Sequence, residues 1–368
     1  MRWADHELYW GRPLKSILCC FDNKILEFEY HHLVSSNITF IDKDFEQKIK
    51  KFVRFKDYLA FFKSQNIILD NKKREQFIVD QLNRIAKKEN LKIYFNSTLL
   101  NEVTNIVEKP NIIKCRFNKR FLEIPDDILV TTMQVHQKYF PTFDSRDNLT
   151  NNFFLVADNK DSKGLIKIGN ENVVEARLND AKFFWDKNKT QNLVKGISNL
   201  KKLSYFEGLG SYFEKIQRLR KLGALISDEL LISKEKVEIA SSICKVDLTS
   251  DLVNEFPELQ GVMGGHFAKS QGFDNDICLA IREHYLPIGP ETKTPKKPYS
   301  VTLAMSDKLD TLSGFFAINL KPTSSKDPFA LRRSAIGLIR LIVENKLEIK
   351  LKDIINYSFS LFNQKGVN

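Results

Sequence analysis

Hydrophobic residues recur at two different spacings along this chain of 368 residues. In the first half, short β-prone runs alternate with helical patterns. Residues 14–30 are predicted to form a hairpin that turns at Asp22-Asn23, and Ile112–Phe117 and Phe153–Ala157 are predicted strands. Helical spacing predicts five helices, over residues 44–63, 71–88, 98–107, 125–136 and 171–185. This mixture predicts an α+β domain over residues 1–195.

After about residue 195 the strand pattern nearly disappears, and residues 196–368 are predicted to form a helical domain. The one long break, Pro287–Pro298, contains four prolines and three lysines, which is typical of an exposed basic loop. The predicted helices cover residues 212–231, 234–248, 274–285, 299–317, 328–345 and 350–363.

The segment from Lys321 to Arg340 is strongly specified. Asp327 suits the N-cap of a helix, and Pro328 suits the first helical position, where a missing N–H costs nothing. Arginines follow, and an arginine-bearing helix face could bind phosphates, although a solvated or salt-bridged face is an equally open interpretation. The predicted apolar stripe consists of Leu331, Ala335, Leu338 and Ile342, and Arg333 and Arg340 share a different face from it.

Composition adds a positive charge, since 57 Lys and Arg residues exceed 46 Asp and Glu residues by 11. Such a balance permits binding to a polyanion, although a lysine-rich codon bias could also produce it.

The five cysteines form no C-x-x-C pair, which predicts neither a zinc ribbon nor a disulfide framework. No apolar run is long enough to span a membrane, and Asp5 and Glu7 do not fit a secretion signal, so a cytoplasmic protein without membrane contact is expected.

Motifs for self-contained nucleotide binding are absent, and the six histidines lack the spacing of a metal site. The helical half resembles the HD phosphohydrolase architecture, with Val246-Asp247 at the His-Asp position and Asp307 as the late aspartate. Two carboxylates without imidazoles are a poor divalent metal centre. Structural hydrogen bonds or salt bridges are the alternative role for both aspartates, and no bound metal is expected.

Two further segments leave alternatives open. Glu255 and Glu258 lie in a glycine-rich corner, Asn254–Ala268, where they could act as acid and base or could cap helices and pair with neighbouring elements. Met133–Pro141 combines Lys138 with aromatic residues that could stack on bases or pack in a core.

Several long segments together resemble the β subunit of the bacterial two-subunit glycyl-tRNA synthetase, from residue 1 to about residue 345. The matching segments are M-R-W at Met1–Trp3, L-L-N-E-V-T at Leu99–Thr104, T-T-M-Q-V-H-Q-K-Y-F-P at Thr131–Pro141, G-N-E-N-V-V-E-A-R-L-N-D-A-K-F-F-W at Gly169–Trp185, K-V-D-L at Lys245–Leu248, E-F-P-E-L-Q-G-V-M-G at Glu255–Gly264, D-K-L-D-T-L at Asp307–Leu312 and K-P-T-S-S-K-D-P-F-A-L-R-R at Lys321–Arg333.

The resemblance implies that glycine and ATP, with Mg²⁺, bind in a separate α subunit, and that this chain binds tRNA(Gly) and the α subunit in an α2β2 complex. It implies no catalytic residue and no cofactor in this chain. It also implies that residues 1–195 are akin to a region of the phenylalanyl enzyme's β subunit, and that residues 196–368 are a degenerate HD-like domain. The chain resembles a central fragment that lacks the anticodon-binding helices.

Candidate tRNA contacts are the cations of the basic helix and two weaker candidates outside it. Two rival functions stay open: a metal-dependent HD-type phosphohydrolase, and an assembly scaffold without tRNA affinity. The candidates are Lys326, Arg332, Arg333, Arg340, Arg177 and Lys138.

Overall fold

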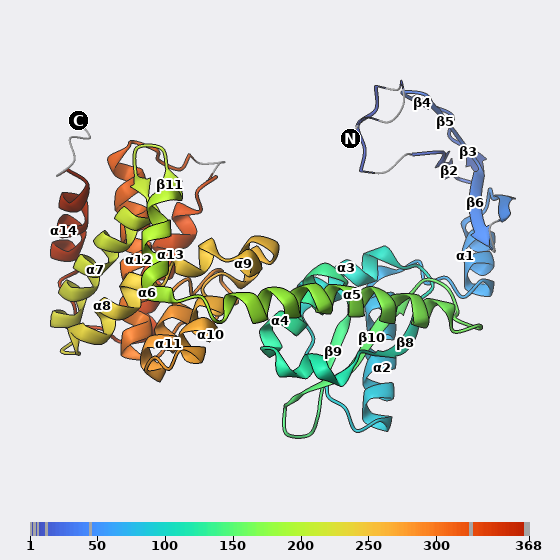
Figure 1. Cartoon of the computed structure of the whole chain (residues 1–368). Coiled ribbons are helices and arrows are strands. Elements are labelled where there is room, and N and C mark those ends of the chain that lie inside the picture. The colour runs from blue at the N-terminus through green and yellow to red at the C-terminus, as the bar shows by residue number, and fades with distance from the viewer. Residues whose placement is uncertain are drawn as a thin grey trace. The chain divides into compact units, whose positions relative to one another are not determined.

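The structure is a computed structural model, which describes residues 2, 5, 7–11, 14–43, 46–323 and 327–363. They form two compact units, whose elements are labelled in Figure 1. The first unit contains Met1–Cys115, Lys138–Asn148 and Asn152–Ile168, and the second contains Arg116–Gln137, Leu149–Asn151 and Gly169–Asn368. The predicted domain boundary at residue 195 stays a prediction.

The predicted hairpin at residues 14–30 is present, but it is shorter than expected. Strands β2 (Cys20–Phe21) and β3 (Lys24–Ile25) pair antiparallel around Asp22 and Asn23, whose φ angles are 47° and 60°. Asp and Asn tolerate this left-handed conformation, which matches the twist of a tight hairpin.

The flanking residues of the predicted hairpin pair with a strand that follows it. Strand β5 (Leu33–Ser36) lies parallel to β1 (Ile17–Leu18) and antiparallel to β4 (Glu29–Tyr30). The result is a small three-stranded sheet with the order β1-β5-β4.

The predicted helix over residues 44–63 is wrong in its first half. Strand β7 (Glu46–Lys51) pairs antiparallel with β6 (Ile38–Lys43), and only α1 (Phe55–Ser64) is helical. The β-prone strand β6 supplies a complete row of backbone partners to β7, and this pairing outweighs the moderate helix propensity of the lysine-rich segment.

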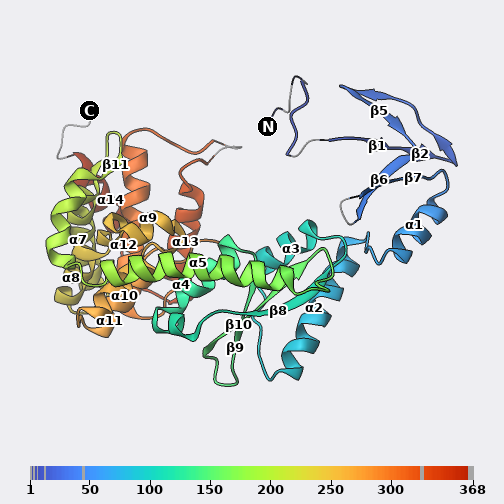
Figure 2. The ribbon, with the colours of Figure 1, turned by 45° about the vertical axis from the view of Figure 1, so that its right-hand side comes forward.

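A compact core in the first unit joins two helices and a sheet. Helix α2 (Asn71–Lys88) has the predicted bounds, and the Asp70 side chain accepts a hydrogen bond from the Lys73 amide at its start. It packs with α3 (Ser97–Ile106) against the sheet β8-β10-β9, as Figures 1 and 2 show. The strands are β8 (Asn111–Arg116), β9 (Phe140–Phe143) and β10 (Leu149–Ala157), and the core side chains are Ile78, Leu82, Ala86, Leu99, Leu100, Val103, Val107, Phe140 and Phe154.

The predicted helix over residues 125–136 is an α-helix that is followed by a π-helical turn. After the 3-10 turn η1 (Lys119–Glu123), helix α4 (Asp126–Thr131) continues directly into the π-helical turn η2 (Thr132–His136). The next predicted helix is longer than expected, since α5 covers Leu165–Asn188. Val174 and Ala181 on α5 are buried, as the helical spacing predicts.

The second unit is mostly helical after residue 195, with one short hairpin. Five of the six predicted helices are confirmed with small shifts in their ends. The helix predicted over residues 234–248 is wrong in its last third, because α8 ends at Ile243 and the 3-10 turn η4 follows it. The hairpin joins β11 (Ser204–Phe206) to β12 (Gly210–Ser211). The remaining elements are α6 (Leu193–Gly196), η3 (Ile197–Lys202), α7 (Tyr212–Glu229), α8 (Lys234–Ile243), η4 (Val246–Thr249), α9 (Asp251–Glu255), η5 (Pro257–Leu259), α10 (Val262–Ser270), α11 (Asn275–Glu283), α12 (Pro298–Ala317), α13 (Leu331–Glu344) and α14 (Leu351–Asn363).

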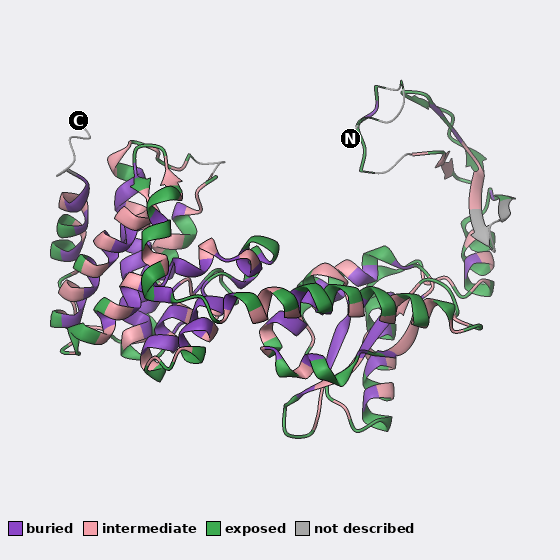
Figure 3. Cartoon of the chain, in the orientation of Figure 1, coloured by how far each residue is buried: buried purple, intermediate pink, exposed green. Residues whose placement is uncertain are grey.

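Helix α12 is the central helix of this unit. Its residues from Ser300 to Asp310 are all buried, and Figure 3 shows the centre of the helical bundle as buried. Its apolar residues pack with α7, α13 and α14, while Asp307, Lys308 and Asp310 bring charges into the interior. The two units together confirm the α+β class.

Helix α13 begins three residues later than predicted. The Asp327 carboxylate accepts hydrogen bonds from the Leu331 and Arg332 amides at 2.8 and 2.9 Å, so it does cap the helix. Ala330 has a left-handed φ of 56°, however, and Pro328 therefore lies in a turn before the first helical residue.

Candidate functional site: a basic helix above a buried charge cluster

The predicted arginines of α13 differ sharply in their surroundings. Arg340 donates to the backbone carbonyls of Gly289, Pro290 and Thr292 at 3.0–3.1 Å and pairs with Glu344 at 2.7 Å. These contacts fix the proline-rich loop against the helix, so Arg340 has a structural role in this chain.

Arg332 also contacts backbone, because its guanidinium donates to the Thr323 carbonyl. Lys326, another candidate, lies outside the described residues. The end of α13 that the sequence marks as basic therefore uses at least one of its cations to hold the segment that precedes it.

Arg333 is exposed, and among the described residues its side chain makes no hydrogen bond or ion pair. It lines a cavity of about 450 Å³ within the second unit. Lys308, Asp307 and Glu258 also line the cavity, although the first two are buried. Its remaining lining comes from Gln260, Tyr285, Pro287, Ile288, Thr311, Ala330 and Ser334. Arg333 is thus the predicted cation that is best placed to meet an external anion.

The two weaker candidates are both paired with acids. Arg177 lies 3.5 Å from Glu255, and Lys138 lies 2.8 Å from Glu102. Both pairs are partly exposed, where ion pairs stabilise by only about 0–1 kcal/mol and exchange readily for other partners. Arg177 belongs to the second unit with the arginines of α13, whereas Lys138 belongs to the first unit.

The glycine-rich corner uses its acids for pairing within the second unit. Glu255 is the partner of Arg177, and Glu258 lies 3.4 Å from Nε2 of His136. In the neighbouring aromatic segment, Tyr139 and Phe140 are buried, so the core interpretation of these two rings is confirmed.

Asp247, one of the two HD positions, is held by the backbone of this corner. Its Oδ2 accepts hydrogen bonds from the amides of Gly261 at 2.5 Å and Gly264 at 3.2 Å. Its Oδ1 is buried without a hydrogen-bond partner among the described residues, and burial raises the pKa of this carboxyl to about 6. Gly261 has a φ of 79°, a conformation that glycine adopts without strain.

Asp307, the other HD position, is surrounded by ammonium groups. Its Oδ1 lies 2.8 Å from Nζ of Lys245 and 3.4 Å from Nζ of Lys215. Burial alone would raise its pKa, but Lys215 and Lys245 outweigh burial and hold the pKa far below the usual range. Asp307 is therefore ionised at neutral pH.

A second acid on α12 completes this buried charge cluster. Asp310 contacts Lys215 at 2.9 Å and Arg218 at 2.5 Å, and both cations come from α7. Burial lowers the pKa of Lys215, but Asp307 and Asp310 outweigh burial and raise it well above the usual value. The cluster thus ties α7 to α12 through charges that are almost fully removed from solvent.

His284 connects the cluster to the end of α11. Its Nδ1 donates to the Ile281 carbonyl at 2.6 Å, and its Nε2 lies 2.8 Å from Nζ of Lys245. Burial and then the Lys245 ammonium lower the pKa of this imidazole to about 3. The ring is therefore neutral, with the Nε2 lone pair directed to the ammonium.

Sequence reasoning found the two aspartates but missed Lys245, which contacts Asp307, and His284, which contacts Lys245. Lys245 stands two residues before Asp247, and His284 lies between Glu283 and Tyr285 in the sequence E-H-Y. A search for sequence motifs could therefore have singled out both residues. Lysine is normally a surface residue, however, and the pattern of K-V-D-L carries no sign that the lysine points inward.

The described residues contain no group of three or more His, Cys, Asp or Glu side chains that could hold a metal ion. No helix in the part of the chain that the structure describes is long and apolar enough to cross a membrane. Acid–base chemistry in the cluster is disfavoured as well, because its carboxylates and ammoniums neutralise one another. The buried charge cluster is suited to structural support, and Arg333 is an exposed cation in the lining of the same cavity as Asp307.

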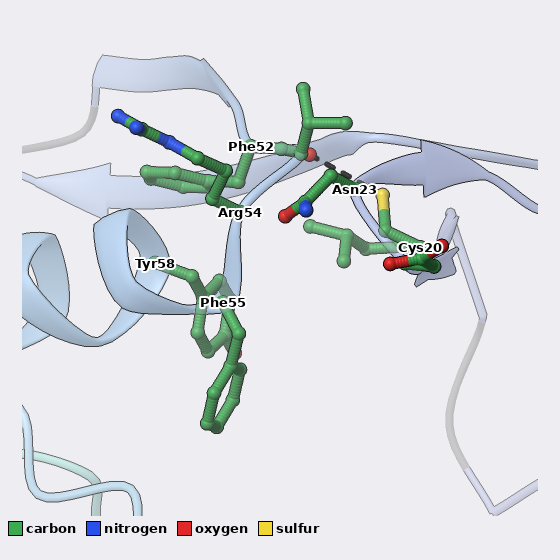
Figure 4. Close-up of a pocket in the computed structure, with 9 residues that line it drawn as sticks. Cys20, Asn23, Phe52, Arg54, Phe55 and Tyr58 are labelled. Atoms are coloured by element: carbon green, nitrogen blue, oxygen red, sulfur yellow. Dashed lines mark hydrogen bonds between the residues drawn. The ribbon is translucent and has the colours of Figure 1, made fainter.

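A second cavity, of about 480 Å³, lies in the first unit (Figure 4). Phe52, Phe55 and Tyr58 line it beside Arg54, and the Cys20 thiol donates to the Phe52 carbonyl at 3.4 Å. Phe55 is 71% exposed. Other large apolar side chains in the first 59 residues are exposed as well, namely Tyr9, Trp10, Phe21, Ile25, Leu26, Phe28, Tyr30, Val34, Ile49, Val53 and Leu59.

Comparison with known proteins indicates the family to which the chain is similar. Residues 1–368 match the family model described as glycyl-tRNA synthetase beta subunit. A glycine–tRNA ligase beta subunit of Rickettsia canadensis is 37% identical over 368 residues, which are 100% of this chain and 54% of the relative. One of Thermodesulfovibrio yellowstonii is 35% identical over 367 residues, 99% of this chain and 54% of the relative. The chain thus spans about half the length of the curated relatives it matches.

Proposed function

Because the chain belongs to the glycyl-tRNA synthetase beta subunit family, we propose that it binds tRNA(Gly) and the catalytic α subunit and so supports ATP-dependent glycylation of the tRNA. The observation that carries this proposal is the family match over the whole chain, together with relatives that are named glycine–tRNA ligase beta subunits. In this proposal the chain acts in the cytoplasm as part of an α2β2 complex.

The proposal places the glycylation chemistry outside this chain. ATP, Mg²⁺ and glycine bind in the α subunit, and no residue of this chain takes part in the reaction. The second unit, which we propose to be a degenerate HD-like domain, supplies a rigid support instead. Its interior is held by the buried charge cluster, which costs desolvation but fixes one arrangement of the helices.

The tRNA-binding surface is proposed to include Arg333. An exposed guanidinium that has no ion pair among the described residues can contact a phosphate without first breaking one, and it presents planar donors that match phosphate oxygens. The excess of 11 positive charges supports the same function, because phosphate neutralisation supplies much of the affinity for nucleic acid. Arg332 and Lys326 are proposed as further contacts, whereas Arg340 acts through the loop that it holds.

The α-subunit contact is proposed to lie on the first unit, around Phe55 and Tyr58. A small set of short strands that leaves many large apolar side chains exposed is typical of a protein interface, since single soluble domains rarely expose such a surface. Aromatic residues are also the side chains that contribute most to protein interfaces.

The test uses the 368-residue chain and the α subunit, which are coexpressed and purified through a tag on the α subunit. Binding of tRNA(Gly) is measured at several salt concentrations. Copurification together with salt-dependent tRNA affinity supports the proposal. Copurification without tRNA affinity at low salt would show an assembly scaffold, and absence of both would contradict the proposal.

The rival hydrolase function receives no support from the geometry. Asp247 and Asp307, the two carboxylates that it needs, are engaged by backbone amides and by ammonium groups, respectively. Stoichiometric metal with phosphodiester hydrolysis that is lost in Asp247→Ala would restore this rival.

A further inference from the structure

We propose that His284, Asp307 and Tyr285 form a cation-binding site that the chain fills with its own Lys245 ammonium, in the place where the HD resemblance would put a metal ion. The proposal concerns the architecture of the second unit, and it holds or fails independently of tRNA binding.

Three different groups face the Lys245 ammonium. Nε2 of His284 and Oδ1 of Asp307 each lie 2.8 Å from Nζ, and the centroid of the Tyr285 ring lies 3.8 Å from it. An imidazole lone pair, a carboxylate oxygen and an aromatic face are all groups that attract cations. The ammonium thus has three partners of different chemistry in the interior of the unit.

The orientation of His284 is fixed for this purpose. Its Nδ1–H donates to the Ile281 carbonyl, so the tautomer is set and Nε2 can only accept. A second hydrogen bond that orients the ring in this way is also usual for histidines that bind metal ions. Lys245 and His284 are 1% and 0% exposed, so the ammonium is enclosed.

A divalent ion does not fit beside these residues. It would have to displace the Lys245 ammonium, and the Lys215 ammonium would remain 3.4 Å from the same Asp307 oxygen. Asp247, the other HD carboxylate, directs its Oδ2 to the amides of Gly261 and Gly264. The resemblance to a metal-dependent architecture is therefore one of sequence and does not extend to the ligand chemistry of the two aspartates.

Replacement of Lys245 by alanine should open the site to an external ammonium. The atoms removed by Lys245→Ala correspond to n-propylammonium, which is the probe, and 1-propanol is the neutral probe of similar shape. At ten times its dissociation constant, a ligand that binds only the folded state raises the folding equilibrium constant about elevenfold. We expect n-propylammonium chloride to stabilise Lys245→Ala in this way, relative to equal NaCl, and to leave the parent chain and Lys236→Ala unchanged.

Lys236 is a suitable control because it is a partly exposed lysine of the same unit, paired with Asp274 and Asp276 at 3.0 and 2.7 Å. Equal stabilisation of the parent chain and Lys245→Ala, or equal stabilisation by 1-propanol, would overturn the proposal. Absence of any effect on a folded Lys245→Ala chain would overturn it too.

A second measurement applies if Lys245→Ala does not fold. Lys245→Met keeps most of the side-chain volume and removes the charge, and it is combined with Asp307→Asn in a double-mutant cycle. Each single variant leaves the charge of the other residue buried without its partner, and the double variant does not. We therefore expect the folding equilibrium constant of the double variant to be at least ten times the value obtained by multiplying the effects of the two single variants. Additive effects would contradict the proposal. So would stoichiometric Zn²⁺ or Co²⁺ in the parent chain that is lost in His284→Ala.

Discussion

The ammonium of Lys245 lies 2.8 Å from Nε2 of His284, deep inside the second unit. A protonated imidazole cannot accept this hydrogen bond, and it would add a second positive charge next to the ammonium. The pair therefore makes the stability of this unit depend on pH, in a direction that can be worked out.

We predict that protonation of His284 destabilises the chain in acid. Its pKa is about 3 in the folded chain, below the value of about 6.5 in unfolded chains, so between these values the unfolded state binds the extra proton. The contribution of the neutral His284 to the free energy of unfolding is fully present above pH 6.5, and it is lost as the pH falls toward 3. Between pH 7 and pH 5 the loss should be about 2 kcal/mol.

The measurement is urea unfolding of the parent chain and of His284→Gln at pH 5 and pH 7. Because glutamine does not titrate, the stability gap between the two proteins should narrow by about 2 kcal/mol at pH 5. A gap that stays constant would show that the imidazole is not held neutral.

We predict the opposite sign for Asp247. Its pKa is about 6 in the folded chain and about 3.9 in unfolded chains, so the folded state binds more protons between these values. The parent chain therefore loses stability from this residue as the pH rises from 4 through 6. Asp247→Asn should gain about 2 kcal/mol relative to the parent between pH 4 and pH 7, measured by urea unfolding. A gain that appears toward acid instead would contradict the buried, partly protonated carboxyl.

We predict a large loss of stability from Asp310→Asn. The change leaves Lys215 and Arg218 buried without a full counter-charge, and breaking a buried pair in this way costs about 3–5 kcal/mol. Asp274→Asn is the matched control, because Asp274 also binds a lysine but at the surface. Thermal unfolding should separate the two variants clearly, and equal melting temperatures would show that the interior cluster does not stabilise the fold.

We predict that Arg333 contributes to tRNA binding and that Arg340 contributes to folding stability. Arg333→Ala should reduce the slope of log affinity for tRNA against log salt by about 1, the contribution of roughly one phosphate contact, with little change in melting temperature. Arg84→Ala is the control, since Arg84 is an exposed arginine of α2 that donates to Gln81 and lies in neither proposed surface. An unchanged slope in Arg333→Ala would remove this residue from the tRNA surface.

Arg340→Ala should behave in the reverse way. The loss of three contacts to backbone carbonyls should cost about 1–3 kcal/mol of folding stability. Limited proteolysis at the proline-rich loop should become faster, whereas the salt slope should change less than in Arg333→Ala. A stable Arg340→Ala chain with an intact loop would contradict the structural role.

How much of this could be predicted from the sequence depends on the kind of interaction. Helix α2 was predictable because Ile78 and Leu82 recur at helical spacing after Asp70, a residue that caps helices. Strand β7 was not, because its lysine-rich sequence becomes a strand only through pairing with β6. Local pattern fixes the first kind of element, and long-range pairing decides the second.

The candidate site shows the same division. Asp327 and the arginines that follow it could be located from the sequence, but their partners could not, because Gly289 and Thr292 contribute only backbone carbonyls. The inward direction of Lys245 was equally invisible. It depends on His284 and Asp307, which are 39 and 62 positions away in the chain and meet it only in the folded unit.

The contacts between Arg340 and the proline-rich loop have a consequence for how this surface can diverge. Arg340 holds the carbonyl oxygens of Gly289, Pro290 and Thr292, and Asn345 holds that of Pro295. Every residue type carries such an oxygen, so these contacts keep the path of the loop and leave the identity of its exposed side chains free. Relatives can therefore change the charge of the loop at Glu291 or Lys293 and present a different surface on the same backbone.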